Sequence, residues 1–125
     1  MEAVVDTNVL IARIIEDDVN HEKAKKLLDK LRKWYLPSIV IHELVWFLKN
    51  KNLDLDLALQ FILHEKAIYV EIVESDIVFA INESKYNPKD YNDFLILSVA
   101  KRLGKQLLTF DEDLKRKYFA YQKLS

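Results

Sequence analysis

The most constraining feature of the sequence is a short apolar stretch that ends at an acidic residue. Ala3-Val4-Val5 is followed by Asp6, after which Thr7 and Asn8 lead into an apolar run of helical character. A strand is apolar at consecutive positions when neighbouring elements cover both of its faces. We therefore expect Asp6 at the carboxyl end of a buried strand, the edge at which open α/β sheets bind ligands. The alternative is that Asp6 only caps the helix that follows.

The same arrangement returns near the other end of the sequence. Gln106-Leu107-Leu108-Thr109 is predicted to be a short strand, Asp111 follows two positions later, and Asp113 lies close by. Helices between successive strands favour parallel pairing, so strands connected in this way end at the same edge of a sheet. We therefore expect Asp111 to lie on the same edge as Asp6.

Two further acids fall inside helical stretches that are otherwise apolar. Glu43 interrupts the predicted helix 38–50, and Asp93 lies in the predicted helix 90–103, three positions after Asp90. An ionised carboxylate among apolar side chains is costly unless a cation or a metal ion accompanies it. The alternatives are that Glu43 reaches solvent or a lysine, and that one of the two aspartates caps its helix.

The alternation of apolar strands and amphipathic helices predicts an α/β fold. Strands are expected at 3–5, 34–36, 68–73 and 106–109, with a short edge strand at 118–124 as a possible fifth. Gly104, the only glycine, is expected to end the helix before the fourth strand in the left-handed conformation. We expect a three-layer α/β/α fold around a parallel sheet of four to five strands, with residues 1–125 forming a single domain.

Composition narrows the class of protein further. The chain has no cysteine, which excludes disulfides and thiolate metal sites and is typical of cytoplasmic proteins. We see neither a membrane-spanning apolar run nor a signal peptide, because Asp6 interrupts the first apolar stretch. The net charge of −1 is unusual for a nucleic-acid binder. However, the surface becomes net positive if four of the 20 acids are held in a metal site. The lysine-rich helix predicted from Asn20 to Lys33 is expected to be a solvated face, the alternative being a track for RNA phosphates.

Together these acids predict an oxygen-rich metal site. Carboxylate oxygens without thiolates suit hard cations such as Mg²⁺ or Mn²⁺, and clustered carboxylates need such a cation to stay ionised together. Divalent ions can activate a water and stabilise displacement at phosphorus, which favours phosphodiester hydrolysis. The expected catalytic residues and metal ligands are Asp6, Glu43, Asp93 and Asp111, with Glu43 acting directly or through water. The expected supporting residues are Thr7, Asn8, Asp90, Thr109 and Asp113.

The order of these motifs resembles that of the PIN-domain nucleases, and in size and layout that of VapC-type toxins. The resemblance rests on Asp6-Thr7-Asn8, on Glu43 in an apolar helix, on Asp93 followed by Phe94 to Ala100, and on Leu108-Thr109-Phe110-Asp111. It implies Mg²⁺- or Mn²⁺-dependent cleavage of RNA and assigns the metal-site roles to the same four acids. It also implies a homodimer and an antitoxin protein as partner, within a type II toxin–antitoxin pair.

Two alternatives remain at this point. One is a PIN-like module that binds RNA or a partner without cutting, against which the presence of all four acids argues. The other is a receiver-type phosphoacceptor domain, which needs paired acids after its first strand and an acceptor aspartate at the end of a central strand. Here Thr7 and Asn8 follow Asp6, while Asp54 and Asp56 fall in a helical pattern, so this alternative fits less well.

Overall fold

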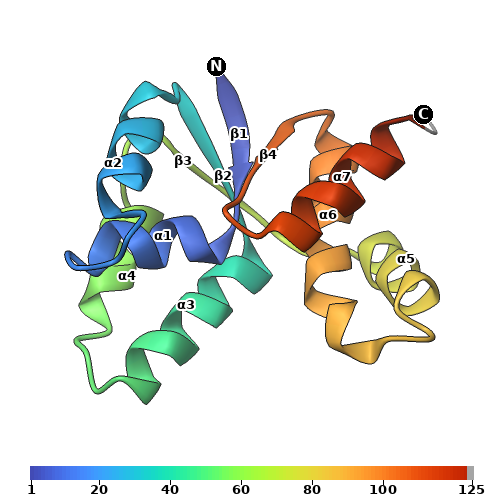
Figure 1. Ribbon diagram of the computed structural model, residues 1–125, viewed down its shortest axis with the longest axis horizontal. Coiled ribbons are helices and arrows are strands. Elements are labelled where there is room, and N and C mark those ends of the chain that lie inside the picture. Colours follow the sequence, from blue (N-terminus) through green and yellow to red (C-terminus); the bar gives the residue numbers. More distant parts are fainter. Residues whose placement is uncertain (124–125) are drawn as a thin grey trace.

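The computed structural model describes residues 1–123, and its centre is a parallel sheet. The sheet has four strands in the order β3-β2-β1-β4, all parallel (Figure 1). The strands are β1 (Glu2–Val5), β2 (Lys33–Pro37), β3 (Ala67–Val70) and β4 (Gln106–Leu108). The parallel sheet that the strand–helix alternation predicts is therefore confirmed, with four strands.

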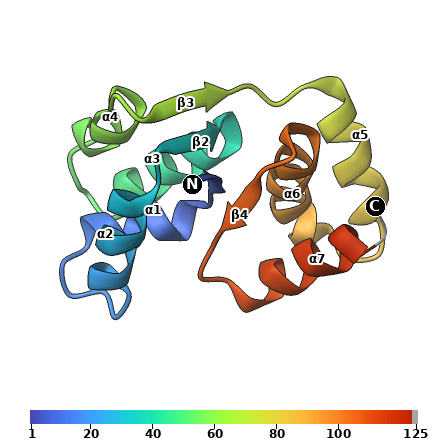
Figure 2. The same cartoon turned by 90° about the horizontal axis from the view of Figure 1, so that it is seen from above.

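Helices cover both faces of this sheet (Figure 2). On one side lie α1 (Thr7–Ile14), α2 (His21–Lys30), α3 (Ser38–Asn50) and α4 (Asp56–Ile62). On the other lie α5 (Glu74–Glu83), the short 3₁₀ helix η1 (Pro88–Asp90), α6 (Tyr91–Leu103) and α7 (Glu112–Lys123). The strand order explains this division. The steps β1–β2–β3 run in one direction and the step from β3 to β4 runs back past β1, so right-handed crossovers place their helices on opposite faces.

The strand register places the carboxyl ends of β1 and β4 side by side at the same edge of the sheet. Val4 pairs with both Tyr35 and Leu107, and Val5 lies beside Leu108. The Asp6 backbone N–H then donates to the Leu108 carbonyl at 2.9 Å. The residues that follow β1 and β4 are therefore neighbours, although more than a hundred positions separate them in the sequence.

The core lies on both sides of β1, whose Val4 and Val5 are fully buried. Among the buried side chains of the helices, leucine is the most frequent. The largest fully buried side chains outside β1 are Leu10, Leu28, Leu36, Leu44, Leu48, Ile96, Leu97 and Leu114. Among residues 1–123, no helix combines the length and the apolar character needed to cross a membrane.

The structure corrects the expected edge strand at 118–124. Residues 112–123 form α7 instead, and position 124 lies outside the described residues. Leu114, Tyr118 and Tyr121 are spaced i, i+4 and i+7, and all three pack on the core, so tertiary packing selects the helix. The third strand is also shorter than expected, because the Ile72 N–H leaves the sheet and donates to the Ser38 hydroxyl.

The end of α6 agrees with the sequence prediction. Gly104 has a φ of 63° and takes the left-handed conformation immediately after the helix. The beginning of α6 differs by one residue, because Asp90 ends the 3₁₀ turn and Tyr91 is the first residue of the helix.

Candidate functional site

Asp6 is the most buried acid of the candidate site, with only 6% of its surface exposed. It is the N-cap of α1, and its Oδ1 accepts from the Thr7 N–H at 2.7 Å. Its Oδ2 accepts from the Thr109 hydroxyl at 2.7 Å. Burial raises the pKa of Asp6 to about 6, with smaller contributions from the charges of Glu43 and Asp93, although both hydrogen bonds oppose the rise. Asp6 therefore caps α1 with one oxygen, and with the other it accepts a hydrogen bond from Thr109 in the loop between β4 and α7.

Glu43 reaches the same edge from the middle of α3. Its Oε1 accepts from the Thr7 hydroxyl at 2.5 Å, and its Oε2 accepts from the Asn92 amide at 2.9 Å. A hydroxyl and an amide thus hold the carboxylate in place, and neither neutralises its charge. Asn92 belongs to α6, and sequence reasoning missed it because no local pattern links it to Glu43.

Asp93 and Asp90 lie at the start of α6 and share one cation. The Lys117 ammonium lies 3.7 Å from the Asp93 carboxylate and 3.5 Å from that of Asp90. The same ammonium lies 5.7 Å from the centre of the Phe94 ring. Burial and then the charge of Asp111 raise the pKa of Asp93, while Lys117 lowers it. Sequence reasoning missed Lys117 because it took residues 118–124 for a strand, whereas only the helix α7 turns this lysine toward α6.

Asp111 caps α7 in the way that Asp6 caps α1. Its Oδ1 accepts from the N–H groups of Asp113 and Leu114, at 2.8 and 3.2 Å. The side chain of Asp113 has a different environment. It is 66% exposed and pairs with Arg116 on the surface of α7. The charge of Asp111 acts on Asp93, which links Asp111 to the other acids, whereas Asp113 is part of an exposed surface pair.

Thr109 joins the two caps. Its hydroxyl donates to Asp6 and accepts from the Asn8 amide at 3.2 Å and from the Asp111 N–H at 3.0 Å. The Asn8 carbonyl oxygen in turn accepts from the Phe110 N–H at 3.1 Å. Thr7, Asn8 and Thr109, which the sequence analysis names as supporting residues, therefore contact the acids or the loop that carries them.

The four acids form one region of negative charge without a finished metal cluster. Asp6 is destabilised in its ionised form by Glu43 and Asp93, and Asp93 by Asp111 and Glu43. Yet within residues 1–123 no three Asp, Glu or His side chains are arranged to hold a metal ion. The donor set consists of carboxylate oxygens with hydroxyl and amide neighbours, which fits a hard divalent cation. In this arrangement the Lys117 ammonium supplies the positive charge.

Comparisons with known proteins agree with this layout. A family model described as PIN domain matches residues 3–120. A search of curated proteins finds no significant match. Among solved structures, the VapC20 toxin of Mycobacterium tuberculosis, described as cleaving the sarcin–ricin loop, has a TM-score of 0.81 at 19% identity over 92% of this chain and 94% of that one. VapBC2 of Rickettsia felis, solved with a promoter DNA fragment, has a TM-score of 0.61 at 21% identity over 93% and 92%.

Proposed function

The chain belongs to the PIN domain family, and from this premise we propose that it is a metal-dependent endoribonuclease, the toxin of a type II toxin–antitoxin pair. The observation that carries the proposal is the approach of Asp6, Glu43, Asp93 and Asp111, from four separate segments, to the carboxyl edge of the sheet. The electrostatic influence of these acids on one another supports a shared site.

Mg²⁺ or Mn²⁺ would be held by Asp6, Asp93 and Asp111, and by Glu43 directly or through water. Such an ion supplies Lewis acidity toward a phosphate oxygen and makes a water more acidic. The protein's own part is to fix the carboxylates. Thr7 and Thr109 each donate to one acid, so the oxygens of Asp6 and Glu43 are oriented before substrate arrives.

The protonation state of Asp6 also affects metal binding in this proposal. Because its pKa is about 6, a large fraction of the metal-free protein carries a protonated Asp6 below neutral pH. A cation favours the ionised carboxylate and lowers this pKa. Metal binding and proton release at Asp6 are therefore coupled. Asp6 must be ionised to act as a metal ligand, and it reaches this state near neutral pH.

The proposed partners follow from the same family. We propose RNA as substrate, an antitoxin protein as inhibitor, a homodimer as the assembly and the cytoplasm as location. The similarity to a VapC toxin and to a VapBC complex supports the first two of these proposals. The receiver-type alternative is not retained, because Asp56 begins α4 and Asp54 precedes it, so neither ends a strand.

A catalytically inactive module is the second candidate, and one observation favours it. The Lys117 ammonium lies 3.7 Å from the Asp93 carboxylate, so a lysine of the chain itself balances charge at this acid. A direct cleavage assay separates the two candidates.

The test compares cleavage of single-stranded RNA by the wild type and by Asp6→Asn and Asp93→Asn, each with Mn²⁺ and with EDTA. Asp113→Asn is the matched control, because this aspartate is exposed and pairs on the surface. We expect cleavage only by the wild type and the control, and only with metal. Equal cleavage in all samples would identify a contaminant, and no cleavage by any of them would favour the inactive module.

A further inference from the structure

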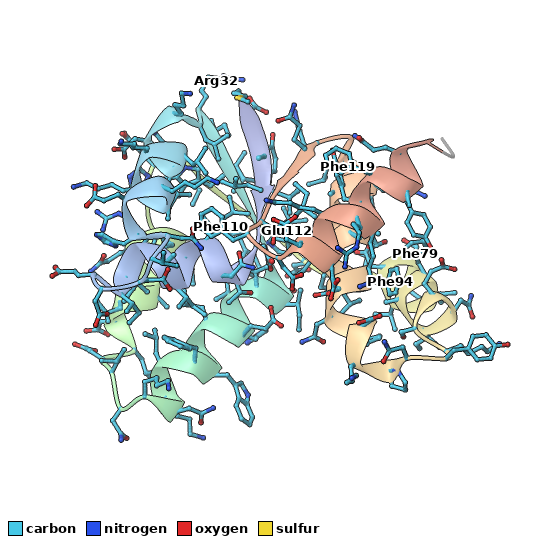
Figure 3. All side chains as sticks on the ribbon, viewed as in Figure 1. Arg32, Phe79, Phe94, Phe110, Glu112 and Phe119 are labelled. Atoms are coloured by element: carbon cyan, nitrogen blue, oxygen red, sulfur yellow. The ribbon has the colours of Figure 1, made fainter. Side chains whose placement is uncertain are left out.

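A hollow beside the candidate site opens between α2 and α7, over the edge strand β4. It encloses about 190 Å³, and its principal lining side chains are Lys23, Leu27, Leu107, Phe110, Tyr118 and Phe119. Within residues 1–123, β4 pairs with β1 alone, so one of its edges has no strand neighbour there. Figure 3 shows Phe110 at the end of β4 and Phe119 on α7.

Aromatic and apolar side chains in this hollow remain partly open to solvent. Phe119 is 57% exposed, and Leu107 and Phe110 are only partly buried. A concave apolar surface with a few polar groups at its rim is typical of a ligand site. The small volume suits a single planar ring.

The rim of the hollow is positively charged. The Lys23 ammonium lies 5.7 Å from the centre of the Phe110 ring, and Lys115 also lines the hollow. Glu112 pairs with Lys115 at 3.3 Å, but both side chains are solvent-exposed, so this pair leaves the lysine available. Next to the hollow, two lysines of α2, Lys26 and Lys30, lie beside one acid, Asp29. The charge therefore favours a planar ligand that carries phosphate.

Hydrogen bonds connect the hollow to the acidic site. Thr109 lines the hollow and donates to Asp6, and Asn8 holds the backbone of Phe110. A chain whose phosphate lies over the carboxylates can therefore place a neighbouring base against the Phe110 ring. Exposed aromatics flanked by lysines are the common platform for single-stranded nucleic acids, because every base can stack and every phosphate can pair.

We infer that this hollow binds one base of single-stranded RNA next to the scissile phosphate. The base stacks on Phe110 and Phe119, while Lys23 and Lys115 contact flanking phosphates. The inference rests on the proposed nuclease function and adds to it a subsite on the β4 side of the acids. It also assigns to α2 a role in contacting RNA, which is one of the two interpretations that its lysine-rich sequence allows.

The test measures binding of a fluorescent 2′-O-methyl RNA octamer in EDTA, so that neither metal nor cleavage contributes. We expect Phe119→Ala to weaken binding at least 5-fold, since stacking of one base is worth about 1–3 kcal/mol. Lys23→Ala should weaken binding. It should also reduce the slope of log affinity against log salt concentration by the amount expected for the loss of about one phosphate contact. Trp46→Ala is the matched control, because Trp46 is also exposed and has its own lysine, Lys49, at 5.9 Å, yet lies on α3.

Several outcomes would overturn the inference. The base subsite would be ruled out if Phe119→Ala and Lys23→Ala bound the octamer with wild-type affinity, or if Trp46→Ala lost as much affinity as they do. The nuclease proposal would still stand in that case, provided that the wild type cleaves RNA with Mn²⁺. Wild-type affinity together with a shift from dimer to monomer in Phe119→Ala would show that a second copy of the chain covers the hollow. A wild type that neither binds the octamer nor cleaves RNA would remove the proposed function itself. Urea unfolding of each variant verifies that it is folded.

Discussion

Asp6 performs two tasks that place opposite demands on its charge. As a helix cap it favours the ionised form, because carboxylates interact well with helix N-termini. As a buried group beside two other acids it favours the protonated form, and this second effect is the larger one. In metal-free protein, ionising Asp6 therefore destabilises the fold.

We expect this cost to be visible as a pH dependence of stability. The folded-state pKa is raised from 3.8 to about 6, so the native state binds the extra proton between these values. The wild type should lose up to about 3 kcal/mol of unfolding free energy, relative to Asp6→Asn, as the pH rises from about 4 to 6, and the difference should then level off. Urea unfolding in EDTA at several pH values measures it. A constant difference across this range would contradict the raised pKa.

Lys117 is expected to compete with a divalent cation for the same carboxylates. Its ammonium lies near Asp90 and Asp93, and its side chain is only 19% exposed. Lys117→Met keeps an unbranched apolar side chain and removes the charge, so Mn²⁺ should bind about 5- to 10-fold more tightly, a change of about 1 kcal/mol. Titration calorimetry measures the affinity directly. Lys115→Met is the control, and unchanged or weaker binding in Lys117→Met would show that the lysine is no competitor.

A buried carboxylate links the helices α5 and α6. Asp76 is fully buried, and it accepts from the Val73 N–H, the Ser98 hydroxyl and the Arg102 guanidinium. Burial acts to raise the pKa of Asp76, but the Arg102 hydrogen bond and the other two donors outweigh it and lower the pKa below its usual value. The guanidinium also donates to the Glu71 carbonyl, so it ties the segment before α5 to α6.

Arg102→Met is therefore expected to destabilise the protein by about 3 kcal/mol at pH 7, because it leaves a buried charge without its cation. The wild-type advantage should shrink as the pH falls below about 4, where Asp76 in the unfolded chain is protonated. Arg116→Met is the control, since its pair with Asp113 is exposed and worth well under 1 kcal/mol. Chemical denaturation at pH 7 and pH 3.5 gives both values, and equal losses in the two variants would contradict a special role for Asp76.

The end of α6 gives a second prediction for this part of the fold. Gly104 has a positive φ of 63°, and a Cβ built there meets no atom within 4 Å. The cost of Gly104→Ala therefore comes from the backbone alone, and we expect about 1 kcal/mol. Gly104→Asn should cost less, because asparagine tolerates this conformation. Thermal unfolding of both variants distinguishes this backbone effect from a packing defect. A packing defect would make Gly104→Asn, with the larger side chain, the more destabilising substitution.

The elements marked by local signals could be predicted from the sequence. The apolar strand before Asp6, the helix around Glu43 and the C-cap at Gly104 each have a pattern within a few residues. The helical form of residues 118–123 could not be predicted in this way, because aromatic residues favour strands locally and only packing on the core decides otherwise. Asn92 and Lys117 were missed for the same reason, since their contacts join helices distant in sequence.

At the level of the whole molecule, an apolar face remains uncovered on α5. Ile77, Val78 and Ile81 are between 38% and 53% exposed, and α5 lies on the outside of the fold (Figure 2). Contiguous apolar surface of this kind marks interaction sites in soluble proteins. The proposed homodimer offers one way to bury it.

Ile81→Glu is therefore expected to shift the protein from dimer to monomer, because a charge placed in an apolar interface is left without a partner. Sedimentation equilibrium measures the change. Val19→Glu is the control, since Val19 is 95% exposed and lies in the turn between α1 and α2. A monomeric wild type would contradict the homodimer, and a dimeric Ile81→Glu would place the contact elsewhere.

The hydrogen bond between Thr109 and Asp6 joins positions 103 residues apart, and this separation has a consequence during synthesis of the chain. A nascent chain whose translation has not yet reached β4 possesses three of the four acids but lacks both the strand that completes the edge and Asp111. Such a chain would lack one of the four acids of the proposed site. Under the proposed function, assembly of the complete site would therefore have to wait for the synthesis of β4 and of the loop that carries Asp111.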